Sequence, residues 1–343
     1  MAYVTPTSKT TGDLIAATDW NQNTVDNPVA LRTGGIAIAS QAAGDIITAS
    51  SSTQLGRSAI TGFGLHTVCD GRLTLTTGTP VTTSDVTAAT TVYFAPYKGR
   101  QIGLYDGSSA WAVVSFNELS IAVPATTNTI YDVYIYNNSG TATLELTAWT
   151  NDTTRATALT TQDGVYVKTG ATTRRYVGSF RTTAVSGQTE DSASKRFVWN
   201  YHNRVDRAMQ LLVSTSNWTY STPTWRQANN STTNQLACVV GVAEDAIEVA
   251  TFADTSCDSV VQGAYGGVSV GVDITNNTSS GAWYSLSSEM ASTNYYHLHG
   301  GYNGVLAAGY HYLAMIEYSS STGTRTWYGS SSRAGIVSRH WRA

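Results

Sequence analysis

Residues 131–148 read YDVYIYNNSGTATLELTA, and this stretch decides the class of fold. Residues two apart on a strand share one face, so Tyr131, Val133 and Ile135 would line one apolar side. Leucine and alanine residues repeat the alternation between 144 and 148, after an Asn-Asn-Ser-Gly segment that favours a tight turn. The stretch therefore predicts a β-hairpin with one buried side.

The same pattern of short apolar segments and turn residues continues on both sides of this hairpin. Apolar segments of strand length recur about every ten residues from 65 to 199 and again from 209 to 328. Turn signals such as Asp106-Gly107 separate them. Helical periodicity of useful length is absent from the sequence. This spacing predicts an all-β chain of the β-sandwich or jelly-roll type.

The first 64 residues differ from the rest because they are rich in Ala, Thr, Gly and Ser and poor in large apolar side chains. A short helix is expected at 18–22, and extended segments are expected from 33 to 64. Such a segment orders against a partner, so we predict an attachment region; the alternative is a flexible tail. The candidate attachment residues are Trp20, Asn21, Ile46 and Leu55.

Charged residues gather at 203–207 and mark a second boundary. The fold class predicted is all-β, with an N-terminal extended attachment segment followed by two β-sandwich or jelly-roll domains. The boundaries are 1–64 for the attachment segment, 65–206 for the first sandwich and 207–343 for the C-terminal sandwich.

Composition narrows the class of partner. Only 13 % of the 343 residues are charged and the net charge is −3, whereas 20 are Tyr and 9 are Trp. Soluble monomers carry about 25 % charged residues, so this chain is expected to bury much of its surface in an oligomer. The basic field that nucleic acid requires is missing, and we predict no nucleic-acid partner.

The cysteines and the N-terminal residues indicate the cellular compartment in which the protein is assembled. Cys69, Cys238 and Cys257 are odd in number and have no metal-ligand spacing, so we predict free thiols and assembly in a reducing cytoplasm. The opening MAYVTP lacks the basic and apolar regions of a signal peptide. Apolar runs all fall short of the roughly 18 residues that span a membrane, and we predict no membrane partner.

The sequence contains no recognisable catalytic signature. A G-x-S-x-G elbow is absent, and the glycine-rich residues 263–267 lack the Lys and Ser/Thr of a phosphate-binding loop. Glu244, Asp245 and Glu248 cluster beside a predicted strand, where a solvated loop edge explains them better than paired catalytic carboxylates. We predict no enzymatic activity, no catalytic residues and no cofactor.

His297 and His299 flank Leu298 and would share one face of a strand, which places both imidazoles within reach of one metal ion. The chain has this pattern once, and tyrosines at 295, 296 and 302 favour a subunit contact or a glycan platform. We predict no metal site and keep the two histidines as the alternative candidate.

Two polar loops in the C-terminal half, 275–281 and 319–323, are the candidate recognition loops. Amide and hydroxyl side chains both donate and accept hydrogen bonds, as sugar hydroxyls require. The alternative is that both are plain hairpin turns. The residues singled out are Asn276, Asn277, Ser320 and Thr322.

The opening, with ATDWN at 17–21, DN at 26–27 and GDIITA at 44–49, resembles the N-terminal region of bacteriophage fibre and other virion structural proteins. The middle, with RRYVGSFRT at 174–182 and RFVWN at 196–200, and the end, with GYHYL at 309–313, are similar to such proteins in style. These motifs are structural, and no site residues carry over from them.

The resemblance implies a homotrimeric fibre, spike or decoration subunit on the surface of a phage head or tail. It would be assembled in the host cytoplasm, bound to other virion proteins and able to contact host surface glycans. Collagen-like and coiled-coil repeats are absent, so a compact projection is expected rather than a long shaft. A polysaccharide-degrading tailspike and a free carbohydrate-binding lectin are the alternative functions.

Overall fold

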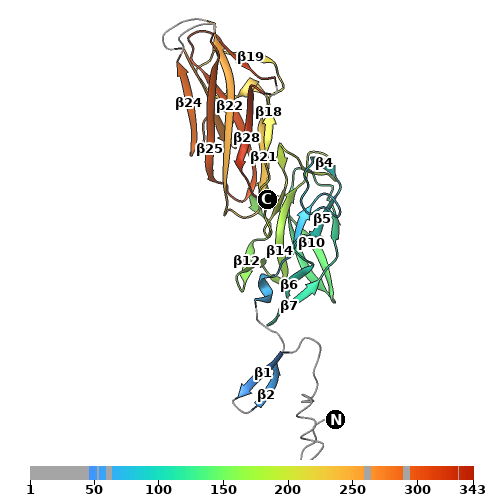
Figure 1. The fold of residues 1–343 in the computed structure, drawn as a ribbon. Coiled ribbons are helices and arrows are strands. Elements are labelled where there is room, and N and C mark those ends of the chain that lie inside the picture. The colour runs from blue at the N-terminus through green and yellow to red at the C-terminus, as the bar shows by residue number, and fades with distance from the viewer. Residues whose placement is uncertain (1–45, 52–53, 59–63, 259–263, 289–293, 331) are drawn as a thin grey trace, which may run out of the picture. The chain divides into compact units, whose positions relative to one another are not determined.

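The structure is a computed structural model, and it describes residues 46–51, 54–58, 64–258, 264–288, 294–330 and 332–343 (Figure 1). The chain divides into two units, Met1–Phe63 and Gly64–Ala343. In the first unit, β1 (Ile46–Ser51) pairs antiparallel with β2 (Gln54–Ser58). The expected helix at 18–22 lies outside the described residues.

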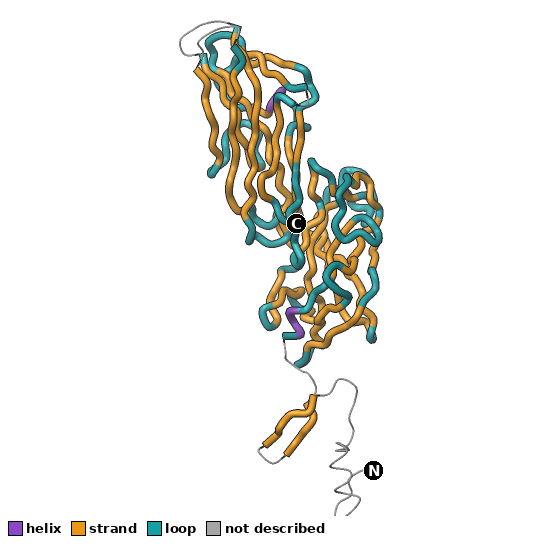
Figure 2. The backbone as a smooth tube through the Cα atoms, viewed as in Figure 1, coloured by secondary structure: helices purple, strands orange, loops and turns teal. Residues whose placement is uncertain are grey.

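The second unit is all-β, which confirms the predicted class. Strands fill most of it, and the described helical segments are two short 3-10 turns, η2 (Leu65–Thr67) and η3 (Ala228–Asn230) (Figure 2). Helices long and apolar enough to cross a membrane are absent from the described residues.

The predicted hairpin is formed by β9 (Ile130–Asn138) and β10 (Thr141–Asn151), with Tyr131 opposite Ala148. Ser139 and Gly140 at the turn both have positive φ, as a two-residue hairpin loop requires. The hairpin belongs to a seven-stranded sheet. The other strands of this sheet are β11 (Thr154–Arg155), β12 (Leu159–Gln162), β13 (Val165–Lys168), β14 (Ala171–Arg181) and β17 (Val198–Asn200).

Two small sheets pack against the apolar face of that sheet. Val133 and Ile135 are fully buried there beside Val92, Phe94 and Ile102, and we call this cluster the first core. The predicted apolar side of the hairpin is thus confirmed. The small sheets comprise β3 (Gly71–Thr74), β5 (Thr91–Pro96) and β8 (Leu119–Ala122), and β6 (Gln101–Tyr105) with β7 (Trp111–Ser115).

A larger sheet of fourteen strands makes up the rest of the unit. Strands β24, β25, β22 and β28 lie side by side in it (Figure 1). β24 pairs with β25 through its first residues and with β23 through its last, so the sheet turns at this strand. Valine, leucine, methionine and isoleucine side chains from β22, β23, β25, β26 and β28 meet in what we call the second core.

The strands of the larger sheet are β4 (Val86–Ala89), β15 (Thr189–Asp191), β16 (Lys195–Arg196), β18 (Gln210–Leu212), β19 (Asn217–Tyr220), β20 (Arg226–Gln227), β21 (Gln235–Val240), β22 (Ala246–Cys257), β23 (Tyr265–Val272), β24 (Ala282–Ser288), β25 (Tyr296–Val305), β26 (Gly309–Ser319), β27 (Arg325–Tyr328) and β28 (Ala334–His340).

The predicted boundary at 206/207 is crossed by both sheet and core. β16 pairs parallel with β21, and Tyr176 and Trp199 are buried in the second core beside residues of β21. Gly241 lies so close to Tyr176 and Trp199 that a Cβ there would meet the Tyr176 hydroxyl at 2.2 Å. The two halves of the unit are therefore packed together at this junction.

Candidate functional site

The predicted recognition residues fall in two separate loops. Asn276 and Asn277 are exposed between β23 and β24, and Ser320 and Thr322 lie between β26 and β27. β23 and β26 run antiparallel, with Gly266 opposite Ser319 and Val272 opposite Leu313. The two loops therefore lie at opposite ends of these strands, and the structure does not bring the four residues together.

Ser320 has a role inside its turn. Its side chain is buried, and its hydroxyl oxygen accepts a hydrogen bond from the backbone N–H of Tyr265 at 3.0 Å. Its own backbone N–H donates to the Tyr265 carbonyl at 2.8 Å. Thr322 is half-buried, so Asn276 and Asn277 are the more accessible pair.

An ionic contact anchors the loop that carries Asn276 and Asn277. Asp273 has a φ of 56°, accepts the Tyr312 backbone N–H at 3.0 Å and lies 2.7 Å from Nδ1 of His311. Nε2 of His311 lies 2.9 Å from the Ala307 carbonyl, so both ring nitrogens face acceptors. Burial by itself would lower the pKa of His311, but the bonds to Asp273 and Ala307 and the charge of Asp273 raise it.

His297 and His299 are both exposed on β25, on one face as predicted. Nδ1 of His297 lies 2.5 Å from Asp254, and the other oxygen of that carboxylate accepts Nε of Arg333 at 2.7 Å. Groups of three His, Cys, Asp or Glu side chains able to hold a metal ion are absent from the described residues. The geometry gives His297 a carboxylate partner across the strand rather than a second imidazole.

The clustered carboxylates are also engaged. Glu244 and Asp245 both pair with Arg204, and Asp245 does so at 2.7 Å. Glu248 lies 3.6 Å from Arg339. Glu244 and Asp245 lie in the loop before β22, whereas Glu248 and Arg339 lie on the neighbouring strands β22 and β28.

A buried polar network surrounds Asp132 on β9. Its carboxylate accepts Nε of Arg155 at 2.7 Å and the Ser179 hydroxyl at 2.8 Å, and Arg155 also donates to the Gly241 carbonyl at 2.5 Å. Burial raises the pKa of Tyr176, whose hydroxyl lies 2.7 Å from that of Ser179. Because Arg155 reaches Gly241, which directly follows β21, the network ties the hairpin to the half of the unit that follows the 206/207 boundary.

All three thiols are buried, as expected for Cys238 in particular. Burial raises the pKa of Cys69 to about 11, and it also raises the pKa of Cys238. Thiols in this state are poor nucleophiles and poor metal ligands.

Exposed apolar side chains concentrate in one part of the chain. Of the eight large hydrophobic residues that are exposed in the described part, six lie between 265 and 305. They are Tyr265, Trp283, Tyr284, Leu286, Tyr295 and Val305.

Three of these exposed residues lie together with Trp225 and Tyr318 in a group that we call the aromatic strip. The three are Tyr265, Tyr284 and Leu286. The ring of Trp225 lies 5.2 Å from that of Tyr284 and 5.4 Å from that of Tyr318, between centroids. Tyr265 stacks on Tyr318 at 5.7 Å. Tyr318 and Leu286 both lie opposite Gly267 on the neighbouring strands, which completes the strip.

Gly267 allows this packing. A Cβ at this position would lie 2.9 Å from Leu286 and 3.2 Å from the Trp225 ring. The missing side chain therefore lets both neighbours lie against the backbone of β23. The strip cannot be recognised from the sequence, because its members come from four segments far apart in the chain.

A buried carboxylate supports the strip from beneath. Glu317 has no exposed surface and accepts Nε1 of Trp218 at 2.6 Å, Nε of Arg226 at 2.7 Å and the Asn229 backbone N–H at 3.1 Å. Burial raises its pKa to about 7. Because Arg226 follows Trp225 directly, this network fixes the segment that carries the tryptophan.

The chain matches no model of a protein family and no curated protein.

Proposed function

We propose that this protein is a non-enzymatic structural subunit of a bacteriophage virion, a fibre, spike or capsid decoration, that works as a homo-oligomer. The observation that carries the proposal is the aromatic strip. Its five side chains include a tryptophan and three tyrosines and no charged group. Permanent subunit interfaces are enriched in aromatic residues and depleted in charge at their centres.

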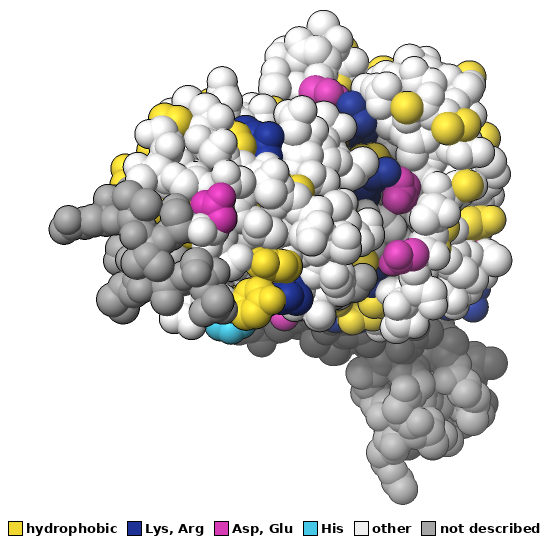
Figure 3. Space-filling view, turned by 90° about the horizontal axis from the view of Figure 1, so that it is seen from above, with side chains coloured by type: hydrophobic (Ala, Val, Ile, Leu, Met, Phe, Trp, Pro, Cys, Tyr) yellow, Lys and Arg dark blue, Asp and Glu magenta, His cyan; other side chains and the backbone are white. Residues whose placement is uncertain are grey.

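A second copy of this chain is the occupant that fits the strip. An uncharged strip disfavours a charged partner surface, because a charge buried against it would lose hydration without gaining a partner. The face in Figure 3 is mostly uncharged, with scattered hydrophobic side chains and a few acidic and basic side chains, some of them adjacent. A homotrimer would place the strip against a different surface of the next copy, and the number three comes from the resemblance to phage fibre proteins.

The separate N-terminal unit supports the attachment part of the proposal. The β1–β2 hairpin has two short strands, and an isolated two-stranded hairpin is marginally stable in water. Docking on another virion protein would supply the missing contacts, with Trp20, Asn21, Ile46 and Leu55 as the proposed contact residues. The compact unit from Gly64 on would then project from the particle surface.

We further propose that this unit consists of two β-sandwich or jelly-roll domains, 65–206 and 207–343, that share a packed junction. The first core is drawn entirely from residues 69–198, which supports a first domain. The second core is drawn largely from residues after 207, together with Ile130 and five aromatic side chains of the first half. Buried free thiols suit assembly in the reducing host cytoplasm.

The test is the oligomeric state of the purified full-length protein by light scattering. We expect a species near three times 36.5 kDa for the wild type. The double variant Tyr284→Ser/Leu286→Ser should dissociate while its circular dichroism stays that of a β protein. Val185→Ser, another exposed apolar residue outside the strip, serves as the matched control and should leave the oligomer intact. A wild-type monomer, or a strip variant that stays oligomeric, would contradict the proposal.

A further inference from the structure

Two exposed basic side chains in the second unit, Gly64–Ala343, form no ion pair with an acidic side chain of the described residues. Lys98 and Arg100 lie in the loop between β5 and β6 and form no ion pair with a described residue. The other described lysines and arginines of this unit pair with a carboxylate or lie buried. In a chain with so few charges, two unpaired cations on one short loop indicate an anionic partner.

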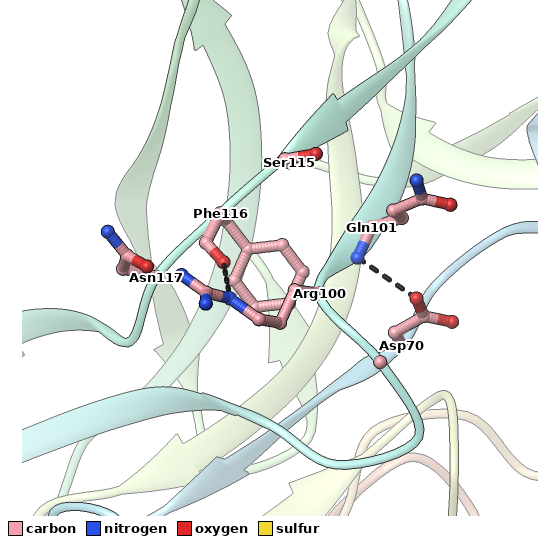
Figure 4. Close-up of a pocket in the computed structure, with 7 residues that line it drawn as sticks. Asp70, Arg100, Gln101, Ser115, Phe116 and Asn117 are labelled. Atoms are coloured by element: carbon pink, nitrogen blue, oxygen red, sulfur yellow. Dashed lines mark hydrogen bonds between the residues drawn. The ribbon is translucent and has the colours of Figure 1, made fainter.

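Arg100 borders a surface groove of about 680 Å³, which we call the Arg100 groove. Its lining residues are Asp70, Gly99, Arg100, Gln101, Ser115, Phe116 and Asn117. In Figure 4, the Arg100 guanidinium and Asn117 lie on one side of the Phe116 ring, Asp70 and Gln101 lie on the other, and Ser115 lies above the ring. The groove thus offers one guanidinium, one carboxylate, two amides and a hydroxyl around a buried phenyl ring.

The guanidinium of Arg100 is held in place through one nitrogen. Its Nε donates to the Phe116 carbonyl at 3.3 Å, and the Phe116 backbone N–H donates back to the Arg100 carbonyl at 2.9 Å. The two terminal amino groups of Arg100 make no hydrogen bond to the described residues. A guanidinium tethered in this way presents its fork to a planar two-oxygen anion such as a carboxylate.

Asp70 is fixed on the opposite side of the groove. One carboxylate oxygen accepts the Gln101 backbone N–H at 2.9 Å, and the Asp70 carbonyl accepts the backbone N–H groups of Tyr97 and Lys98. A Cβ on Gly99 would lie 2.4 Å from that carboxylate, so glycine keeps the carboxylate open to the groove. Its second oxygen retains acceptor capacity for a hydroxyl group.

A second hollow of about 410 Å³ continues on the far side of Arg100 and shares Arg100 and Asn117 with the groove. Glu118 fixes its rim by accepting the Thr77 hydroxyl at 2.5 Å and the Gly78 backbone N–H at 2.7 Å. Two adjoining hollows with mixed polar and apolar linings and a cation between them match a ligand made of linked polar units with apolar faces rather than a single small ion.

We propose that the Arg100 groove binds an acidic oligosaccharide, with the Arg100 fork on a sugar carboxylate and with Asp70, Gln101 and Asn117 on sugar hydroxyls. Asp70 and Glu118 disfavour a polyanion such as nucleic acid, because they would repel closely spaced phosphates. They suit hydroxyl donors, which carboxylates accept well. This inference goes beyond the proposed function, since subunit association requires no ligand at this groove.

Isothermal titration of the full-length protein tests the inference with two probes in which the carboxylates are widely spaced or single: a hyaluronan tetrasaccharide and sialyllactose. We expect at least one probe to bind with a Kd below about 1 mM, and its carboxyl-reduced counterpart to bind at least about tenfold more weakly. Arg100→Gln should weaken binding of that probe by about tenfold or more, and Asn117→Ala should weaken it less. Arg339→Gln, the same change at an exposed arginine elsewhere, should have no effect.

The inference is overturned if none of the probes binds at concentrations up to about 10 mM, or if a reduced probe binds as well as its acid. It is also overturned if folded Arg100→Gln binds like the wild type, or if single-stranded DNA competes at the groove. Light scattering on the same samples separates this result from the oligomer proposal. Arg100→Gln should keep the oligomer, and Tyr284→Ser/Leu286→Ser should keep sugar binding.

Discussion

Glu317 is a carboxyl group with no exposed surface, and donors of three kinds surround it: an indole, a guanidinium and a backbone N–H. Its pKa is raised to about 7, chiefly by burial, from an ordinary value of 4.5. A raised carboxyl pKa means that the folded state binds this proton more tightly than the unfolded state does. The stabilising contribution is therefore complete below about pH 4.5 and is lost as the pH rises through about 7.

Glu317→Gln should remove this dependence, because an amide cannot ionise. We expect the free energy of unfolding of the wild type to fall between pH 5 and pH 8 relative to that of the variant, as measured by urea denaturation. The pH dependence of other titratable groups is common to both proteins and cancels in the difference. His202 is one such group, because burial and two nearby arginines lower its pKa to about 3. Parallel pH profiles for the two proteins would show that Glu317 does not titrate in this range.

Single residues also show where sequence reasoning reached its limit. His297 and His299 share a face as predicted, because strand alternation is local. The partner of His297, Asp254, comes from 43 positions away and could not be read from spacing. Arg100 went unnoticed for a related reason: an unpaired arginine is recognisable only once the partners of the other charged residues are known.

At the scale of elements, the anchor of the 273–281 loop can be tested. Asp273→Asn keeps an acceptor for the Tyr312 N–H and tolerates positive φ, but it removes the charge beside His311. The pKa of His311 should lie above 6.5 in the wild type and fall in the variant, as followed by NMR titration. The raised pKa stabilises the fold at low pH, and this contribution is lost as the pH rises through the folded-state value.

Hydrogen exchange provides the second readout for this loop. Amides near Asn276 and Asn277 should exchange faster in Asp273→Asn than in the wild type. Asp206→Asn is the matched control, because Asp206 lies 3.8 Å from His340 on the surface. A His311 pKa at or below 6.5 in the wild type would contradict the anchor.

The hairpin at 131–148 shows how far an element can be predicted. Its alternation fixed the strands, the turn and the face that packs into the first core. The opposite face was not foreseen, because Tyr134 is buried in the second core by strands that come much later in the chain. The aromatic strip escaped prediction for the same reason, since Trp225 and the strands β23, β24 and β26 meet only in the folded sheet.

At the scale of the whole molecule, the junction at Gly241 governs how the halves relate. The Asp132 network and the aromatic rings of Tyr176 and Trp199 reach across the 206/207 boundary. The charged run at 203–207 suggested a domain boundary, and its residues bind within the fold: Arg204 pairs with Asp245, and Arg207 pairs with Asp191. Charge clustering alone does not distinguish a solvated linker from an ionic junction.

Removal of the N-terminal unit tests the attachment proposal at this scale. A chain that begins at Gly64 should keep its β-type circular dichroism, because the compact unit includes both cores. It should fail to join virions when supplied during infection, since the proposed contacts are gone. Full-length Val185→Ser is the control and should join normally. Normal incorporation of the shortened chain would assign attachment to another part of the protein.

The buried thiols give the molecule three built-in reporters of breathing motions. Cys69 lies in the first core, Cys238 in the second, and Cys257 at the end of β22. A shielded thiol reacts with a disulfide reagent only when its surroundings open transiently, so each labelling rate measures the frequency of opening at one place. Comparing the three rates would show whether the halves open together or one at a time, without a single substitution in the chain.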